Sequence, residues 1–190
     1  MSHRLPLLLA ALAATAAAAS ACTDVNGTDG KDYVAGGGAV IEIPEGDRKA
    51  PVDVSGETLS GDHLDLADRR GSVVVVNVWW SGCGPCKVEA PMLEDAADEL
   101  AGDATIVGID IRNSKEDGLA FERGLDISYP SIYDNGSEQL LNFPTPFNPR
   151  DMPATVVLDR QGRVAALVRG QLPSKLTLVE LVEGVAAENG

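Results

Sequence analysis

The chain has 190 residues, enough for one compact domain with appended segments, and its 44% hydrophobic and 23% charged residues are typical of a globular protein. Its 29 acidic residues outnumber the 15 basic ones and give a formal net charge of −14 at pH 7. Nucleic-acid binding requires clustered Lys and Arg, and the chain has no basic stripe. The composition therefore excludes a nucleic-acid partner.

Residues 1–21 are expected to be an export signal peptide. His3 and Arg4 give a basic start, residues 5–19 are almost entirely apolar, and Ala19-Ser20-Ala21 ends the run like a small-residue cleavage site. A transmembrane anchor is the alternative. It is disfavoured because the segment is short, rich in alanine and followed by no stop-transfer cluster of charges.

Cys22 follows this run directly. The sequence Ala-Ser-Ala-Cys resembles the lipobox of bacterial lipoproteins, in which the cysteine is lipidated and becomes the new N-terminus, although Ala19 stands where Leu is usual. We expect lipidation at Cys22 because ordinary secretory cleavage, the alternative, would leave an exposed free thiol outside the cell. Residues 22–49, rich in Gly, Asp, Thr and Glu, are expected to form a lipid-anchored flexible tether spanning on the order of 30 Å.

The folded domain is predicted over residues 50–190, and its first elements are short. Residues 52–54 and 57–60 indicate a small β-hairpin, and residues 64–69 indicate a short helical piece. The run at 73–79 is almost unbroken in β-branched apolar residues, which is typical of a strand covered on both faces by helices.

Alternating helices and strands are predicted after this strand. The pattern indicates a helix over 85–100, a strand over 105–111, a helix capped by Ser114 with Asp117, a strand over 129–133, a turn over 134–136 and a helical turn capped by Ser137. A hairpin over 154–158 and 164–168 and an amphipathic helix from Pro173-Ser174 end the chain. On this helix Leu176, Val179 and Val182 are expected on one face, with Leu178, Leu181 and Val185 beside them. This order predicts a three-layer α/β domain.

The candidate redox site is Cys83-Gly84-Pro85-Cys86, between the buried strand and the following helix. Two cysteines in the first turn of a helix bring their sulfurs close enough to bond. The free N–H groups and the helix dipole favour a thiolate on Cys83, and Pro85 fits a helix start, where its missing N–H costs nothing. Cys86, one turn further, should stay buried and protonated until it resolves a mixed disulfide.

Other interpretations of the pair are weaker. A zinc site requires about four ligands, and the mature chain offers only these two cysteines and His63. A purely structural disulfide over so short a loop would constrain little chain entropy. A chance pair is disfavoured because the motif follows an apolar strand and opens a helix. No metal and no cofactor is expected.

The residues around the motif resemble the active-site stretch of the TlpA/ResA-like thioredoxin family. The similar segments are residues 76–87 with Glu89 and Pro91, Ala50-Pro51 with the hairpin, Gly108-Ile109-Asp110, and residues 152–159 with Gly162. The resemblance covers residues 50–187. It implies a thioredoxin-like three-layer α/β/α sandwich with an N-terminal β-hairpin addition.

The resemblance also implies roles for single residues. Cys83 would be the attacking thiol and Cys86 the resolving thiol, and Pro153 would be the cis-proline that faces them. Met152, just before it, would pair its backbone with the substrate. Without the resemblance, Pro153 would be interpreted as an ordinary edge proline.

Asn77, Trp79, Trp80 and Glu89 are predicted to support the cysteines, and two positions depart from the family pattern. Gly82 stands where Trp is usual, so the apolar shield over the disulfide is thinner, and Trp80 could partly compensate. Asn77 replaces the buried Asp of cytoplasmic thioredoxins, and an amide cannot accept the proton of Cys86. We therefore expect slow deprotonation of Cys86, relayed by Glu89 or by water.

The segment 143–150 resembles an insertion close to the sulfurs. It contains three prolines and two phenylalanines. Such a stiff aromatic segment could either contact partner proteins or pack against the domain.

The resemblance implies an extracytoplasmic, membrane-tethered thiol–disulfide oxidoreductase that exchanges disulfides with exported proteins and is supplied with electrons by a membrane protein. Gly84-Pro85 matches the dipeptide of reducing thioredoxins, which favours a reductant, as in cytochrome c maturation; an oxidant of folding exported proteins stays open. A copper-binding metallochaperone on the same fold usually has a wider cysteine spacing and a distal His, and no His follows His63. A peroxidase on this fold needs a lone reactive cysteine with a Thr or Ser two or three residues before it and a proline further upstream. Ser81 alone does not supply this pattern.

Overall fold

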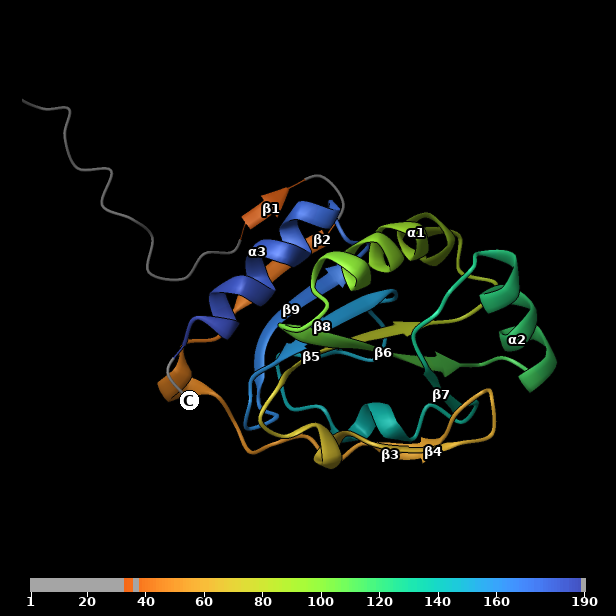
Figure 1. The fold of residues 1–190 in the computed structure, drawn as a ribbon, viewed down its shortest axis with the longest axis horizontal. Coiled ribbons are helices and arrows are strands. Elements are labelled where there is room, and N and C mark those ends of the chain that lie inside the picture. Colours follow the sequence, from red (N-terminus) through yellow and green to blue (C-terminus); the bar gives the residue numbers. More distant parts are fainter. Residues whose placement is uncertain (1–32, 36–37, 189–190) are drawn as a thin grey trace, which may run out of the picture.

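The computed structural model describes residues 33–35 and 38–188, so the predicted signal peptide and Cys22 lie outside the described residues. The main sheet contains β1 (Tyr33–Ala35), β2 (Gly38–Glu42), β5 (Val73–Trp79), β6 (Ala104–Ile111), β7 (Ser131–Asp134), β8 (Ala154–Leu158) and β9 (Val164–Gly170). Its seven strands follow the order β1-β2-β9-β8-β5-β6-β7 (Figure 1). A separate hairpin pairs β3 (Ser55–Glu57) with β4 (His63–Asp65).

The predicted buried strand is confirmed as β5, next to the middle of the sheet. It runs parallel to β6 and antiparallel to β8, and all of its residues are buried. In this register Asn77 lies between Gly108 on one side and Thr155 on the other. Because β5 is buried on both faces, polar side chains along it must find partners inside the protein.

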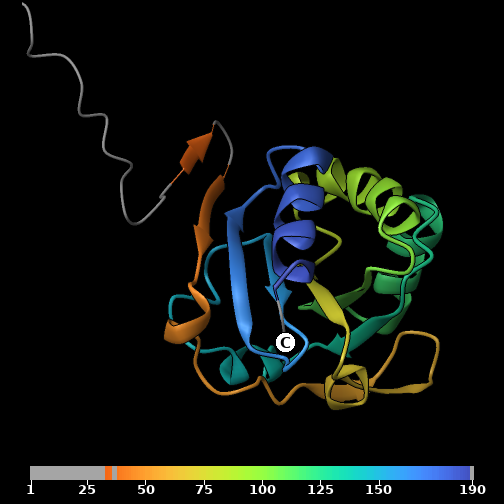
Figure 2. The same cartoon turned by 60° about the vertical axis from the view of Figure 1, so that its left-hand side comes forward.

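Two helices, α1 (Gly84–Glu99) and α3 (Lys175–Ala186), lie side by side over one face of the sheet (Figures 1 and 2). The third helix, α2 (Lys115–Gly124), begins as predicted, with the Ser114 side chain accepting a hydrogen bond from the backbone N–H of Asp117. The prediction for Leu176 is wrong, since this side chain is 61% exposed. The buried face of α3 is formed by Leu178, Val179, Leu181, Val182 and Val185.

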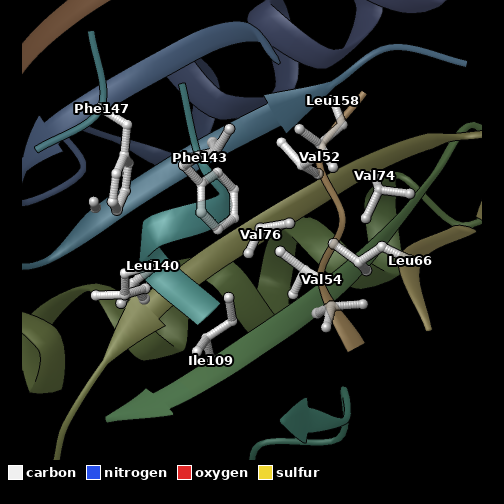
Figure 3. Packing of buried hydrophobic residues seen from close by; sticks show 14 of the residues in the cluster. Val52, Val54, Leu66, Val74, Val76, Ile109, Leu140, Phe143, Phe147 and Leu158 are labelled. Atoms are coloured by element: carbon white, nitrogen blue, oxygen red, sulfur yellow. The ribbon is translucent and has the colours of Figure 1, made fainter. Parts of the chain in front are cut away.

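The opposite face of the sheet is covered by the N-terminal hairpin region, the 3-10 helix η3 (Gln139–Asn142) and the loop that follows it. Figure 3 shows Val52, Val54 and Leu66 packed with Leu140 and residues of the sheet. Phe143 and Phe147 are buried in the same cluster, with ring centroids 4.9 Å apart. Of the two roles considered for segment 143–150, packing is therefore the one that its phenylalanines perform.

The hairpin forms further along the chain than predicted. Residues 52–54 were expected to be its first strand, but Val52 and Val54 face the core, and the Val52 N–H donates to the carbonyl of Gly162. The turn between β3 and β4 includes Gly61, whose φ of +101° favours glycine. The helical piece predicted over 64–69 shrinks to η2 (Leu66–Arg69), capped by Asp65.

Ser137 does not cap the helical turn that follows β7, contrary to the prediction. Its φ is +59°, and η3 has no cap from the residue that precedes it. The Asp134 carboxylate instead accepts hydrogen bonds of 2.9 Å from the N–H groups of Glu138 and Gln139. The Asp-Asn-Gly turn thus supplies its own cap, as short acidic side chains commonly do.

The folded domain begins before residue 50, which corrects the expected end of the tether at 49. β2 pairs with β9 over its whole length, from Gly38 opposite Gly170 to Glu42 opposite Ala166. Arg48 is then held by Glu188 and Asp159. The β-branched residues Val40, Ile41 and Ile43 are few and lie within a Gly-rich and acidic stretch, so the sequence alone did not indicate a strand there.

Candidate active site

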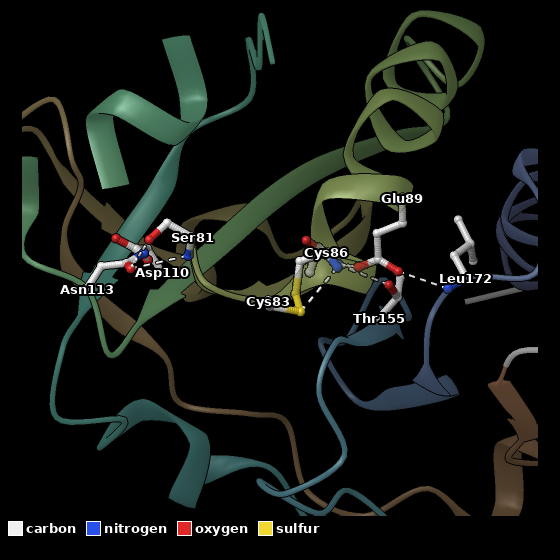
Figure 4. Close-up of a disulfide and its surroundings, with 9 residues drawn as sticks. Ser81, Cys83, Cys86, Glu89, Asp110, Asn113, Thr155 and Leu172 are labelled. Atoms are coloured by element: carbon white, nitrogen blue, oxygen red, sulfur yellow. Dashed lines mark hydrogen bonds between the residues drawn. A yellow bond between two sulfur atoms is a disulfide. The ribbon is translucent and has the colours of Figure 1, made fainter. Parts of the chain in front are cut away.

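Cys83 and Cys86 form a disulfide at the start of α1, with their Cα atoms 5.2 Å apart (Figure 4). Cys83 is the N-cap residue of the helix, and its Sγ accepts a hydrogen bond of 3.1 Å from the backbone N–H of Cys86. Cys83 is 6% exposed and Cys86 is 1% exposed. The more exposed of the two cysteines is therefore the one whose sulfur faces a backbone donor and the positive end of the helix, which favours its thiolate after reduction.

Glu89 is a buried carboxyl on the same side of α1 as Cys86, three residues further along the helix. Its Oε1 accepts a hydrogen bond of 2.9 Å from Nδ2 of Asn77, and its Oε2 accepts one of 2.8 Å from the N–H of Leu172. The Asn77 amide also donates to Oγ1 of Thr155, its cross-strand neighbour. Asn77 therefore orients Glu89.

Burial raises the pKa of the Glu89 carboxyl to about 7, against the opposing effect of the hydrogen bonds from Leu172 and Asn77. A carboxyl with a pKa near 7 exchanges protons readily at neutral pH. Each oxygen of the carboxylate keeps a free lone pair beside its hydrogen bond, so the group can still accept a proton.

A second polar network lies on the other side of the disulfide. Asp110, at the end of β6, accepts a hydrogen bond from Nδ2 of Asn113, and Oδ1 of Asn113 accepts from both the N–H and the hydroxyl of Ser81 (Figure 4). Sequence reasoning did not single out Asp110 or Asn113 as site residues. The available signal was an acidic residue inside an otherwise apolar strand.

The two tryptophans occupy different places. Trp79 is buried, stacks on Phe121 at a centroid distance of 4.4 Å and donates from its Nε1 to Oγ of Ser131. Trp80 is half-buried, and its indole fills the space beside Gly82, where any Cβ atom would overlap the ring. The indole therefore lies on the loop that leads into Cys83, at the place where the sequence lacks the usual Trp.

The Met152–Pro153 peptide bond is cis, and it comes just before β8. Ala154 pairs with Val78, so Pro153 lies at the edge of the sheet where β5 ends and the cysteine motif follows. The Pro153 carbonyl accepts a hydrogen bond of 2.9 Å from the N–H of Gly170. The fold thus brings residues 152–153 to the same edge as the disulfide, and their role in substrate binding stays a prediction.

Within residues 33–35 and 38–188, no helix is long and apolar enough to cross a membrane. The same part of the chain contains no group of three or more His, Cys, Asp or Glu side chains arranged to hold a metal ion.

The chain is similar to known redox proteins over most of its length. Residues 47–167 match the AhpC/TSA family. The chain is 27% identical over 134 residues to the thiol-disulfide oxidoreductase ResA of Halalkalibacterium halodurans, an alignment that covers 67% of this chain and 72% of ResA.

Two solved structures share the fold. One is a DsbF homologue from Corynebacterium diphtheriae, with 33% identity and a TM-score of 0.66, covering 76% of this chain and 92% of that one. The other is a secreted thiol-disulfide isomerase from Corynebacterium glutamicum, with 28% identity and a TM-score of 0.69, covering 87% and 98%.

The thioredoxin-like fold with its added hairpin and the resemblance to ResA-like proteins are both confirmed by these findings. The disulfide between Cys83 and Cys86 lies where such proteins carry their redox pair. The chain is a thiol–disulfide oxidoreductase that belongs to the AhpC/TSA family.

Proposed function

We propose that this oxidoreductase is exported, is held at a membrane through a lipid on Cys22, and reduces disulfides of other exported proteins, with cytochrome c maturation as one setting. A membrane protein would return electrons to its disulfide. The observation that carries the exchange chemistry is the Cys83–Cys86 disulfide at the N-terminus of α1, with Cys83 facing a backbone N–H and Glu89 one turn beyond Cys86.

The first step is attack by the Cys83 thiolate on a sulfur of the partner's disulfide. A new S–S bond forms between Cys83 and the partner, the partner's own S–S bond breaks, and one partner sulfur leaves as a thiolate that takes up a proton. The backbone N–H of Cys86 and the helix dipole stabilise the Cys83 thiolate before the attack.

The second step is resolution by Cys86. Its thiol gives its proton to the Glu89 carboxylate, and the resulting thiolate attacks Sγ of Cys83, which releases the partner's second sulfur and forms the Cys83–Cys86 bond. The partner gains two electrons and the oxidoreductase loses two. Asn77 takes no proton, but its hydrogen bond to Oε1 holds Glu89 in place for this transfer.

The roles of the cysteines are tested by trapping. Cys86→Ser should accumulate a mixed disulfide with oxidised insulin or an exported protein, because the resolving thiol is missing, whereas Cys83→Ser should form none. Insulin reduction by either variant at the wild-type rate would refute the scheme.

The role of Glu89 is tested by the rate of resolution. Glu89→Gln should slow release of the partner from the mixed disulfide by about 100-fold near pH 7, the lower end of the usual range for loss of a general base. Glu94→Gln changes another carboxyl of α1, which accepts a hydrogen bond from the N–H of Ser128, and should resolve at the wild-type rate. Equal rates of resolution for wild type and Glu89→Gln would show that water, and not Glu89, takes the proton of Cys86.

The redox direction follows from the reduction potential of the cysteine pair. A value near that of thioredoxin, about −270 mV, supports a reductant, and a value near about −120 mV, as in strong oxidants, would replace the proposal by oxidation of folding exported proteins. Equilibration with glutathione or dithiothreitol buffers measures it.

The location is tested in cells. Radiolabelled lipid should be incorporated into the wild-type protein and not into Cys22→Ala. Equal labelling of both would exclude the anchor at Cys22 and leave a secreted protein, as is described for the Corynebacterium glutamicum relative.

A further inference from the structure

Asp110 is a fully buried acidic residue that the exchange chemistry does not use. Its Oδ1 accepts a hydrogen bond from Asn113, whereas its Oδ2 has no hydrogen-bond partner among the residues that the structure describes. Burial raises the pKa of the Asp110 carboxyl to about 7, and the nearby carboxyls of Glu122 and Asp117 on α2 act in the same direction. Burying a carboxyl that receives a single hydrogen bond lowers the stability of the fold, so a compensating role for Asp110 is expected.

The hydrogen-bond acceptors of Asp110 fix the orientation of the Asn113 amide. Oδ1 of Asp110 is an acceptor in the carboxylate and stays one in the neutral acid when the proton is on Oδ2, so Nδ2 of Asn113 points to Asp110 and its Oδ1 points to Ser81. Oδ1 can then accept from the Ser81 N–H at 3.2 Å and from the Ser81 hydroxyl at 2.6 Å. A flipped amide would place its NH2 group against these two donors, and both bonds would be lost.

Ser81 belongs to the short segment that leads into the redox pair. The N–H of Cys83 donates to the carbonyl of Trp80 at 3.1 Å, so residues 80–83 form a turn, and Ser81 is the residue of that turn fastened to the domain by side-chain hydrogen bonds. The turn places Cys83 at the N-cap of α1, where its Sγ meets the N–H of Cys86. Loosening the turn would weaken that contact.

We propose that Asp110 is a positioning residue for the redox pair: through Asn113 it fastens Ser81, and thereby holds Cys83 in the capping position that favours its thiolate. This inference rests on the exchange function and deepens it. The site then has a carboxyl network on each side, Glu89 for the proton of Cys86 and Asp110 for the placement of Cys83 (Figure 4).

The test compares three variants by the pH profile of iodoacetamide alkylation of Cys83 in the reduced protein, with mass spectrometry to assign the modified cysteine. Asp110→Leu removes the acceptor and should lower the alkylation rate at pH 7 about tenfold, which corresponds to a shift of about one pH unit in the midpoint. Asp110→Asn keeps a carbonyl that accepts from Asn113, and its profile should return to within about twofold of wild type.

Asp134→Leu is the matched control. Asp134 also ends a strand at this edge of the sheet and is also buried, but it caps η3 and is not hydrogen-bonded to the Asn113–Ser81 network. This variant should lose stability and keep the wild-type Cys83 profile. A wild-type profile in folded Asp110→Leu, or an equal change in Asp134→Leu, would overturn the inference.

Ser81→Ala keeps the proposal testable if Asp110→Leu does not fold. It removes the 2.6 Å bond at a half-buried position and should lower Cys83 alkylation at pH 7 by about two- to threefold; no change would count against the proposal. Alkylation needs no protein partner. A failure of the exchange function itself would appear separately, as an absence of insulin reduction by the wild-type protein.

Discussion

At the scale of single residues, the buried carboxyl next to the redox pair lies on α1 and not on β5. Cytoplasmic thioredoxins keep an acid where this chain has Asn77, and here the buried acid, Glu89, stands on the helix instead. Asn77 lies across the strand pair from Thr155 and reaches Glu89 with the same amide. Asn77 therefore holds the Glu89 carboxyl on the helix that also carries Cys86, and the relay of the Cys86 proton by Glu89 stays a prediction.

The first prediction concerns Glu89 and pH. Its carboxyl has a pKa of about 7 in the folded protein and an ordinary value of 4.5, so between these two pH values the folded state retains a proton that the unfolded state has released. Stability should therefore fall as the pH rises through this window, by up to about 3 kcal/mol for this group. Urea unfolding at pH 4.5, 6 and 7.5 should show a smaller fall for Glu89→Gln than for wild type.

Asp110 should also make stability fall as the pH rises toward 7, because burial raises the pKa of its carboxyl to about 7. Glu89→Gln is therefore expected to remove part of the fall and not all of it. Glu94→Gln, on the same helix, serves as the control for replacing a carboxyl of α1 by an amide. Identical pH profiles for wild type and Glu89→Gln would contradict the prediction.

At the scale of elements, the junction between β5 and α1 determines how the disulfide meets a partner. The loop there has no room for a side chain at Gly82, because the Trp80 indole occupies that space. Gly84, two residues on, has open space around it. The helix can begin at Gly84 with Cys83 as its cap only if the preceding turn keeps its compact form.

The second prediction is that Gly82→Ala displaces the Trp80 indole. Overpacking of this kind typically costs about 1–3 kcal/mol, and the freed indole should be more accessible to acrylamide, as measured by quenching of tryptophan fluorescence. Gly84→Ala introduces the same methyl group into open space and should change quenching little. Equal quenching of the two variants would show that Trp80 does not rest on Gly82.

At the scale of the whole molecule, the segment before residue 50 joins distant parts of the domain. The guanidinium of Arg48 binds both carboxylate oxygens of Glu188, at 2.5 and 2.6 Å, and Oδ2 of Asp159 at 3.1 Å. Its Nε donates to the carbonyl of Ile43. The side chains of Arg48 and Asp159 are only 3% exposed, so their ion pair is shielded from solvent, whereas Glu188, which follows α3, is 33% exposed.

The third prediction follows from this burial. Arg48→Ala leaves Asp159 and Glu188 without their shared partner and should destabilise the protein by about 3 kcal/mol. Lys115→Ala removes an ion pair of 2.5 Å to Glu57 at a more exposed position and should destabilise the protein much less than Arg48→Ala. Thermal or urea unfolding of both variants measures the difference, and similar losses would contradict the burial argument.

The sequence by itself determined the chemistry and the main architecture. The apolar run before the motif, the proline between the cysteines and the hydroxyl cap at Ser114 are local signals, and each predicts its element from neighbouring residues alone. Those signals were sufficient to place the redox pair at a strand-to-helix junction, which the disulfide at the start of α1 confirms.

Only the tertiary structure decided how that pair is surrounded. Glu89 receives its hydrogen bond from Leu172, 83 positions away, and Asn77 reaches Thr155, 78 positions away. The strand β2 is recognisable only through its pairing with β1 and β9. The pKa of Glu89 and the pairing of β2 depend on which distant groups exclude water and supply hydrogen bonds. The spacing of neighbouring residues in the sequence does not specify those contacts.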